Sequence, residues 1–343
     1  MKALIATALL FVGSCATIRH SEKIDNLKSS ITYDNKAVVE NYLNTINSAD
    51  LKIHLEEVSS DKYNGRKTGE EGHNQVCDYI RDYYKNNQII APESYSNYYQ
   101  KVPKSALPDG LNDSQNIIAY IEGSEFPDEY VFISAHSDHE GVIDGQIYNG
   151  ADDNGSGTAA VLEMAEAFSL AVKEGYRPKR SIVFLHVTAE EVGLHGSRYY
   201  TENPVFPLEN TIATLNIDMI GRVDDRHIDN ENYIYLIGAD KISTELHYIA
   251  QSANKTFVNL NLDYKYNDDN DSNRYYYRSD HYNFALKGVP VIFFFNGEHE
   301  DYTKPTDTAD KINYPLLEKR TKLIFATAWY IANAETRLKA EII

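Results

Sequence analysis

Acidic and imidazole side chains follow three apolar runs of the sequence. His136 is the last residue of YVFISAH (130–136), and Glu190 and Glu191 directly follow SIVFLHVTA (181–189). Asp218 is the charged residue near the end of ATLNIDM (213–219). Asp153 lies in GADDNGSG, where a loop enters a predicted helix. Ligands of open α/β sheets bind where strands end, so these groups are expected in one crevice. One imidazole with several carboxylates predicts a site suited to Zn²⁺.

Charge repulsion strengthens this interpretation of the cluster. Taken singly, an Asp at a strand end often caps a helix, and a Glu pair is usually solvated. Neighbouring carboxylates at the mouth of apolar strands, however, repel one another and lose hydration. A bound cation is the simplest compensation for several such groups together.

Alternating strand and helix patterns must position these residues. Apolar runs rich in Val, Ile and Phe predict strands at 116–123, 130–136, 181–189, 213–219, 233–238 and 290–296. Helical patterns are expected at 38–47, 69–85, 155–174, 242–253, 280–286 and 315–337. The order predicts a single α/β domain, with a central mixed, mostly parallel sheet flanked by helices on both faces.

The amino-terminal residues have the composition of an export signal. Residues 1–14 combine Lys2 with a short apolar run, too short to span a bilayer, and are interpreted as a signal peptide. Val12 to Cys15 resemble a bacterial lipobox, which predicts a lipid anchor on Cys15. Residues 15–37 are then expected to form a tether without a periodic pattern, followed by the folded domain at 38–343.

Charge and cysteine content narrow the possible partners. The formal net charge of −18 argues against binding to nucleic acid or to anionic lipid, so membrane contact is expected only through the Cys15 anchor. With Cys15 lipidated, Cys77 has no partner for a disulfide, and its spacing within VCDYIRDYY is typical of a buried helix position.

Several ordered motifs between Asp61 and Tyr314 resemble the dizinc aminopeptidases of the bacterial leucyl aminopeptidase and aminopeptidase Y type, to which glutaminyl cyclases are related. The motifs are SSDKYNGRKTGEEG (59–72), AHSDHEG (135–141), YNGADDNGSGTAAVLEMA (148–165), AEEVGLHGS (189–197), NIDMIGR (216–222), RSDHYNFALKGVP (278–290) and DYTKPTDTADKI (301–312). The resemblance implies a zinc exopeptidase fold of the phosphorylase/hydrolase-like kind.

The resemblance also implies a role for each matched residue. His136 and Asp218 would bind the first metal ion, and Asp153 would bridge both ions. Glu191 would bind the second ion, while Glu190 would act as the general base and Asp138 would orient His136. Zn²⁺, as one or two ions, is therefore the expected cofactor.

One position departs from the family pattern. The His that binds the second metal normally follows the Tyr of the closing motif, where this chain has Thr303. Either His299 or Asp301 substitutes for it, or the second metal binds weakly. The pattern places His139 at the rim of the site, and His186, His195 and His281 are expected to have structural roles.

These inferences predict an exported aminopeptidase, periplasmic or attached to the outer membrane of a bacterium, that removes residues from the amino end of peptide substrates. One alternative is a glutaminyl cyclase-like transferase with a single zinc ion. Another is a catalytically degenerate lipoprotein that binds peptides or metals. The presence of Glu190 argues against the second alternative, because a protein without activity has no physical need for a base beside its metal ligands.

Overall fold

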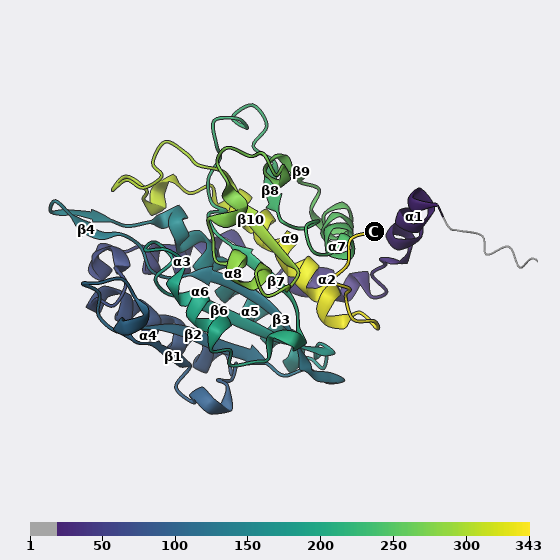
Figure 1. The fold of residues 1–343 in the computed structure, drawn as a ribbon, viewed down its shortest axis with the longest axis horizontal. Helices are drawn as coiled ribbons and strands as arrows, with labels where there is room; N and C mark the ends of the chain where they lie inside the picture. The colour runs from purple at the N-terminus through teal and green to yellow at the C-terminus, as the bar shows by residue number, and fades with distance from the viewer. Residues whose placement is uncertain (1–18) are drawn as a thin grey trace, which may run out of the picture.

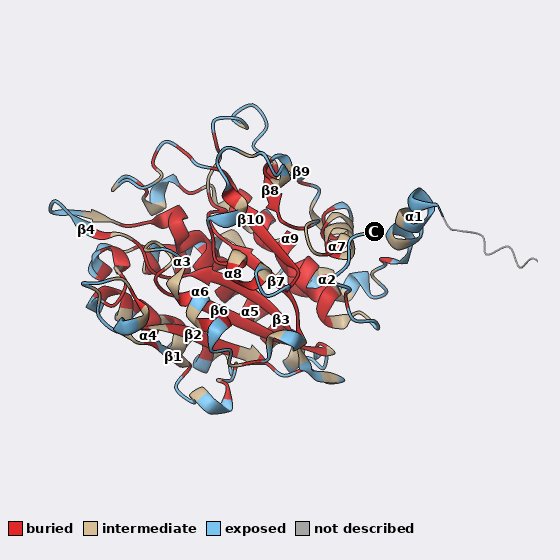
Figure 2. Cartoon of the chain, viewed as in Figure 1, coloured by how far each residue is buried: buried red, intermediate tan, exposed pale blue. Residues whose placement is uncertain are grey.

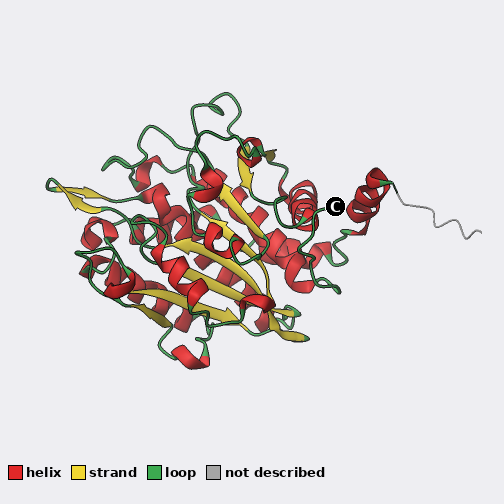
Figure 3. Ribbon diagram, viewed as in Figure 1, coloured by secondary structure: helices red, strands yellow, loops and turns green. Residues whose placement is uncertain are grey.

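The computed structural model describes residues 19–343, which form an eight-stranded mixed sheet with helices on both faces (Figures 1 and 3). The strand order is β1-β2-β6-β3-β7-β10-β8-β9. Its four central strands, β6, β3, β7 and β10, are mutually parallel, whereas β2 and β8 flank them in antiparallel orientation. This arrangement confirms the predicted α/β architecture.

All six predicted strands are present in the sheet. The strands not predicted are each three or four residues long, too short to show a clear alternating pattern. The strands are β1 (Tyr99–Val102), β2 (Ser114–Ile121), β3 (Phe126–His136), β4 (Gly141–Ile143), β5 (Gln146–Tyr148), β6 (Arg180–Val187), β7 (Thr211–Ile217), β8 (Tyr233–Ile237), β9 (Asn261–Asp263) and β10 (Val291–Phe295).

The six predicted helices are also present, with ends that differ by a few residues from the expected ones. Helices α1, α3 and α6 were not predicted. The helices are α1 (His20–Ser30), α2 (Lys36–Leu43), α3 (Ser48–Val58), α4 (Glu71–Asn86), α5 (Gly157–Lys173), α6 (His195–Glu202), α7 (Thr244–Ala253), α8 (His281–Ala285) and α9 (Tyr314–Asn333).

Local sequence signals account for several helix starts. The Asn47 side chain accepts hydrogen bonds from the backbone N–H groups of Ala49 and Asp50 and so caps α3. The Asn313 side chain caps α9 in the same way, and Pro315 occupies the first turn, where no intrahelical donor is needed.

The amino-terminal part of the described chain differs from the expected unpatterned tether. Helix α1 lies within that segment, beside α7 at the periphery of the molecule (Figure 1), and none of its residues is buried. Ile31, which follows α1, is buried in the main core, so the folded domain begins before residue 38. The expected signal peptide and Cys15 lie outside the described residues.

The core lies on both sides of the central strands (Figure 2). On β3, Val131 and Ile133 face the larger cluster with α5 and α9, whereas Phe132 faces a smaller cluster with α6 and α8. Strands apolar on both faces are the pattern expected for a sheet covered on both sides. Cys77 is buried in the larger cluster, as predicted.

Within residues 19–343, no helix combines the length and apolar character needed to cross a bilayer.

Candidate metal and catalytic site

The predicted site residues meet at the carboxyl ends of three neighbouring parallel strands. His136 is the last residue of β3, Asp218 follows the last residue of β7, and Glu190 lies in the loop after β6. The order β6-β3-β7 therefore places the two outer groups on either side of His136. Parallel strands impose this convergence, because their carboxyl ends all lie on the same side of the sheet, at the ends of the strands.

His136 is the centre of the cluster. Its Nε2 atom lies 3.2 Å from Asp153 Oδ1 and 3.4 Å from Asp218 Oδ1. Ligand atoms of His136, Asp153 and Asp218 all lie within 4.8 Å of one another, as do those of His136, Glu190 and Glu191. Each set has the composition and spacing of a possible zinc site.

Asp138 supports the cluster through its backbone and its carboxylate. Its carbonyl oxygen lies 3.2 Å from His136 Nδ1, which leaves Nε2 directed at the other carboxylates. Its carboxylate accepts hydrogen bonds from the Thr68 hydroxyl, at 2.7 Å, and from the Glu190 backbone N–H, at 3.2 Å. Asp138 therefore orients His136 mainly through the backbone oxygen and also holds the loop of Glu190 in place.

A chain of hydrogen bonds fixes the carboxylate of Asp218. The Ser134 hydroxyl donates to the Asn216 side-chain oxygen, and the Asn216 amide donates to the Ser279 hydroxyl, both at 2.8 Å. Ser279 in turn donates to Asp218 Oδ2 at 2.6 Å. With one oxygen held in this way, the other oxygen faces His136.

Asp153 lies in the turn Ala151–Ser156, which leads into α5. The Asp307 carboxylate accepts hydrogen bonds from the backbone N–H groups of Asp152, at 3.0 and 3.1 Å, and Asp153, at 3.1 Å. Asp307 thereby fixes the backbone from which the Asp153 carboxylate reaches the cluster.

The electrostatics of the cluster favour a bound cation. Burial raises the pKa of Asp153 to about 6, and the nearby Glu191 carboxylate adds to the rise. Burial likewise raises the pKa of Glu191 to about 8 and holds the pKa of Glu190 well above its usual range. Burial opposes the charging of His136, but Asp218 and Glu190 outweigh it and raise its pKa. A divalent ion would stabilise the ionised carboxylates, because the protein groups alone do not balance their negative charge.

His139 is part of the site rather than of its rim. Its side chain is buried, and its Nδ1 atom lies 2.6 Å from Glu191 Oε1. His139, Asp153 and Glu191 form a third set of ligand atoms within 4.8 Å of one another. The expectation of a peripheral His139 was wrong, because its backbone N–H bonds to the Arg66 carbonyl and its buried ring contacts Glu191.

The structure does not bring the closing-motif candidates into the cluster. His299 Nε2 lies 3.2 Å from Asp152, whose carboxylate is not among the possible metal-binding groups of residues 19–343. Asp301 forms ion pairs with Arg222, at 2.9 Å, and Lys311, at 2.6 Å. Thr303 is exposed.

A small pocket with aromatic walls adjoins the cluster. Its lining includes four carboxylates of the cluster, those of Asp153, Glu190, Glu191 and Asp218. The rest is lined by Met219, Tyr275, Arg278, Phe293, Phe295, Glu298 and Tyr302. Arg278 and Glu298 form an ion pair at 3.1 Å. The pocket thus combines acidic groups at the cluster with an apolar wall.

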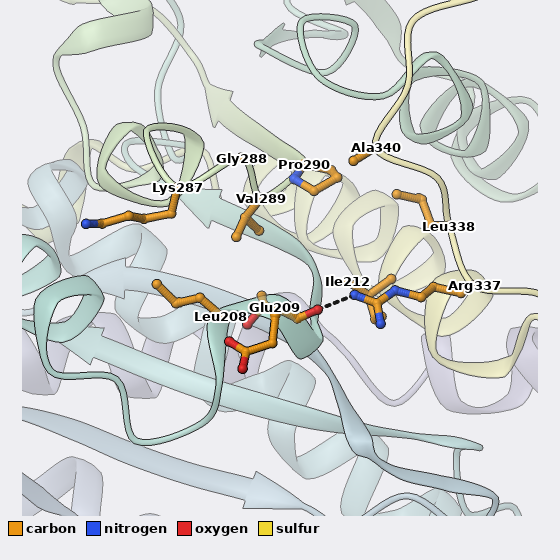
Figure 4. Close-up of a pocket in the computed structure, with 11 residues that line it drawn as sticks. Leu208, Glu209, Ile212, Lys287, Gly288, Val289, Pro290, Arg337, Leu338 and Ala340 are labelled. Carbon is orange, nitrogen blue, oxygen red and sulfur yellow. Dashed lines mark hydrogen bonds between the residues drawn. The ribbon is translucent and has the colours of Figure 1, made fainter.

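A cavity of about 440 Å³ lies at the other end of the parallel strands, away from the cluster (Figure 4). It is lined by residues at the amino ends of β7 and β10 and by the carboxyl-terminal segment, with Arg337 donating a hydrogen bond to the Glu209 carbonyl. None of the possible metal-binding groups of the described chain lies among these residues.

Sequence reasoning missed several supporting residues. Thr68 and Ser279 lie inside quoted motifs, KTGEEG and RSDH, but their hydroxyls acquire a role only through contacts distant in sequence. Asp280 is a buried carboxylate whose pKa burial raises to about 7, with Asp218 and Asp138 adding to the rise. His186 has the expected structural role, with Nε2 2.6 Å from the Tyr84 hydroxyl.

Comparison with known proteins identifies the family. The sequence pattern of peptidase family M28 matches residues 116–328, which is more than half of the chain and includes the whole cluster. The chain belongs to this peptidase family.

Two curated relatives show the extent of the similarity. The chain is 30% identical to leupeptin-inactivating enzyme 1 of Streptomyces exfoliatus over 267 residues, which cover 77% of the chain and 52% of that protein. It is 39% identical to the aminopeptidase NAALADL1 of Mus musculus over 111 residues, covering 32% of the chain and 14% of that protein. The chain thus spans about half or less of the length of these relatives.

Solved structures share the fold. LapB from Legionella pneumophila superposes with a TM-score of 0.69 at 19% identity, covering 92% of this chain and 81% of that chain. A zinc aminopeptidase from Bacillus subtilis superposes with a TM-score of 0.64 at 16% identity, covering 87% of this chain and 98% of that chain. The glutaminyl cyclase of Porphyromonas gingivalis superposes with a TM-score of 0.65 at 16% identity, covering 82% of this chain and 97% of that chain. At these identities the similarity shows the fold alone.

Proposed function

We propose that this protein is a zinc-dependent aminopeptidase that hydrolyses the first peptide bond of peptides with a free amino terminus. The observation that carries the proposal is the cluster of His136, Asp153 and Asp218, with Glu190 and Glu191 beside it, in a chain of the M28 peptidase family. Similarity to a protein named as an aminopeptidase and to a solved zinc aminopeptidase supports it.

The proposed roles combine those that the family resemblance implies with the position of each group in the cluster. His136, Asp153 and Asp218 hold one Zn²⁺ ion, and Asp153 and Glu191 contribute to a second. Zinc supplies a Lewis acid that polarises the scissile carbonyl and lowers the pKa of water. Glu190 accepts the proton of the attacking water and passes it to the amine that leaves. Asp138 keeps His136 and the Glu190 loop in place.

The pocket beside the cluster supports the proposed substrate class. Its carboxylates are suited to the ammonium group of a free amino terminus, which an acetylated peptide lacks. Phe293, Phe295 and Met219 offer an apolar surface to the first side chain of the substrate. We therefore expect apolar amino-terminal residues to be preferred over charged ones.

Removal of the metal, followed by assays on three substrates, tests this proposal. The protein is treated with a chelator, dialysed, and assayed with and without added Zn²⁺ on a leucyl peptide, its N-acetyl form, and a peptide that begins with Gln. We expect zinc-dependent hydrolysis of the free peptide and little reaction of the acetylated one. Activity that survives complete metal removal would contradict the proposal.

The same assay separates the alternatives, because products are analysed by mass. Hydrolysis adds one water and releases an amino acid, whereas cyclisation of an amino-terminal Gln releases ammonia. Ammonia release without hydrolysis would favour a glutaminyl cyclase-like transferase, the class of one protein with a similar fold. Metal binding without either reaction would favour a degenerate binding protein.

We propose further that the protein is exported by a bacterium, to the periplasm or outer membrane, and anchored through lipid on Cys15. The support is the sequence alone: Lys2, a short apolar run, and the residues Val12 to Cys15. Expression with a labelled fatty acid should label the wild type, and Cys15→Ser should release an active, unlabelled protein. Unlabelled wild-type protein would contradict the anchor.

A further inference from the structure

The second metal position needs a ligand that the closing motif does not provide. Thr303 is exposed, and the carboxylate of Asp301 is engaged by two basic side chains. His299 is buried against Asp152 rather than against the cluster. A further imidazole, if the site has one, must therefore come from another part of the chain.

His139 is positioned to provide that imidazole. It is 2% exposed, and one of its ring nitrogens lies within 4.8 Å of ligand atoms of both Asp153 and Glu191. Its Nδ1 atom faces Glu191 Oε1. Its Nε2 atom is buried, and no group of residues 19–343 forms a hydrogen bond with it. Other buried imidazoles of the described residues also have a ring nitrogen without a partner, but of these only His139 belongs to a possible metal-binding set.

The surrounding backbone is shaped to hold this ring. A Cβ atom at Gly150 would lie 2.5 Å from both Cγ and Cδ2 of His139, so only glycine leaves room for the imidazole. The Gly150 carbonyl accepts a hydrogen bond from Arg66 at 3.1 Å, and the Arg66 carbonyl accepts one from the His139 backbone N–H at 3.1 Å. Buried Arg66 thus fixes both the ring and the loop against which it lies.

We propose that His139 is a ligand of the second metal ion, together with Glu191 and a shared Asp153, and that it takes the place of the His absent at Thr303. One imidazole and two carboxylates form a donor set that binds Zn²⁺. The two metal positions then receive one imidazole each, from residues three apart in the segment AHSDHEG. This inference rests on the proposed metal-dependent function of the same site.

Metal stoichiometry and affinity test the assignment without reference to turnover. Wild-type protein, His139→Ala and the control variant His299→Ala are freed of metal and titrated with Zn²⁺ by calorimetry, with equilibrium dialysis as a second measurement. We expect two ions per wild-type chain and per His299→Ala chain. We expect His139→Ala to bind one ion with the wild-type affinity and the other at least about 100-fold more weakly, because loss of an outer-shell group alone costs 10 to 100-fold.

A conservative variant separates a ligand from an orienting residue. In His139→Gln the side-chain amide can still donate to Glu191 but is a poor zinc ligand. We expect it to behave as His139→Ala. Two tightly bound ions in His139→Gln, or loss of an ion in His299→Ala, would overturn the assignment.

Two controls distinguish loss of a metal ligand from misfolding and from failure of the proposed function. Metal-free variants should have the circular dichroism spectrum of the metal-free wild type, and Co²⁺ bound to the wild type should lose part of its visible absorption in His139→Ala. Two tight ions in every variant would overturn the role of His139 while leaving the proposed function intact. A wild type that binds no metal would instead overturn the proposed function.

Discussion

At the scale of residues, the site depends on side chains that hold the candidate ligands. Asp218 is oriented by the hydrogen-bond chain through Ser134, Asn216 and Ser279, which leaves only one of its oxygens facing His136. Groups that orient a ligand typically contribute 10 to 100-fold to metal affinity. The chain of three polar residues should therefore influence metal binding although none of them is a candidate ligand.

Replacing Ser279 with Ala tests this role. We expect zinc affinity to fall roughly 10 to 100-fold, with little change in the unfolding temperature of the metal-free protein, because Asp218 loses its fixed orientation. Competition with a chromophoric chelator measures the affinity. Ser169→Ala is a matched control, since its buried hydroxyl bonds to the Asn87 carbonyl away from the site. Equal zinc affinity in both variants would exclude a role for Ser279.

The residues of the cluster could be predicted from the sequence, but their supporting contacts could not. His136, Asp153, Glu190, Glu191 and Asp218 follow recognisable strand and helix patterns, and the strand ends converge whenever the sheet is parallel. The direction of a loop side chain depends on contacts distant in sequence. The sequence therefore predicts His139 at the rim and His299 as a candidate ligand, whereas in the structure His139 contacts Glu191 and His299 contacts Asp152.

At the scale of elements, the loop that carries the Glu pair is held between β6 and α6. The Asn116 side chain accepts a hydrogen bond from the Thr188 backbone N–H and donates one to the Gly196 carbonyl, both at 3.0 Å. A Cβ atom at Gly196 would lie 2.0 Å from the Thr188 carbonyl oxygen. Glycine thus permits the start of α6 to lie directly against the end of β6, and Glu190 and Glu191 lie between these contacts.

Gly196→Ala should displace this loop. We expect a loss of about 1–3 kcal/mol in the free energy of unfolding, the usual range for overpacking, together with reduced turnover. Chemical denaturation and a peptide assay measure the two effects. Glu202→Ala, at the exposed end of the same helix, should change neither. An unaltered stability of Gly196→Ala would show that α6 can shift without cost.

Long apolar strands were predictable, whereas very short strands and a fully exposed helix were not. The parallel central strands are apolar on both faces and are unmistakable in the sequence. Strands β4 and β9 have three residues each, which leaves too few positions for an alternating pattern. Helix α1 is exposed throughout and therefore lacks the apolar stripe that would have distinguished it from a tether.

At the scale of the whole molecule, the buried carboxylates should make the stability of the metal-free protein depend on pH. Burial raises the pKa of Glu191 to about 8 and of Asp280 to about 7. In the unfolded chain both ionise near pH 4, so the folded form binds more protons above that pH. Their contribution to stability is complete at low pH and is lost as pH rises through 7 to 8.

Three buried histidines have the opposite effect on stability, which falls as the pH is lowered. Burial lowers the pKa of His73 to about 4 and of His186 and His281 to about 3, so stability from these groups is lost as pH falls below their ordinary value near 6.5. The window from pH 6.5 to 8.5 therefore excludes these three histidines. It reports the buried carboxylates together with His136 and His299, whose raised pKa values also make stability fall as pH rises.

We expect the metal-free protein to lose on the order of 2 kcal/mol of stability between pH 6.5 and 8.5. Zinc should stabilise the protein more at pH 8.5, where its carboxylate ligands are ionised at no further cost. Urea unfolding at both pH values, with and without Zn²⁺, measures this. A metal-free stability that is constant or rises over this range would mean that the carboxylates are already compensated by protein groups.

In the proposed mechanism, Glu190 acts as a base beside metal ions that it does not help to hold. Zinc content and peptide turnover, measured on the same samples of the wild type and Glu190→Gln, test it most directly. We expect unchanged zinc content and turnover lowered by about 10² to 10⁴-fold, the usual contribution of a general base. A variant that retains most of its turnover, or that loses its zinc together with its activity, would exclude this role for Glu190.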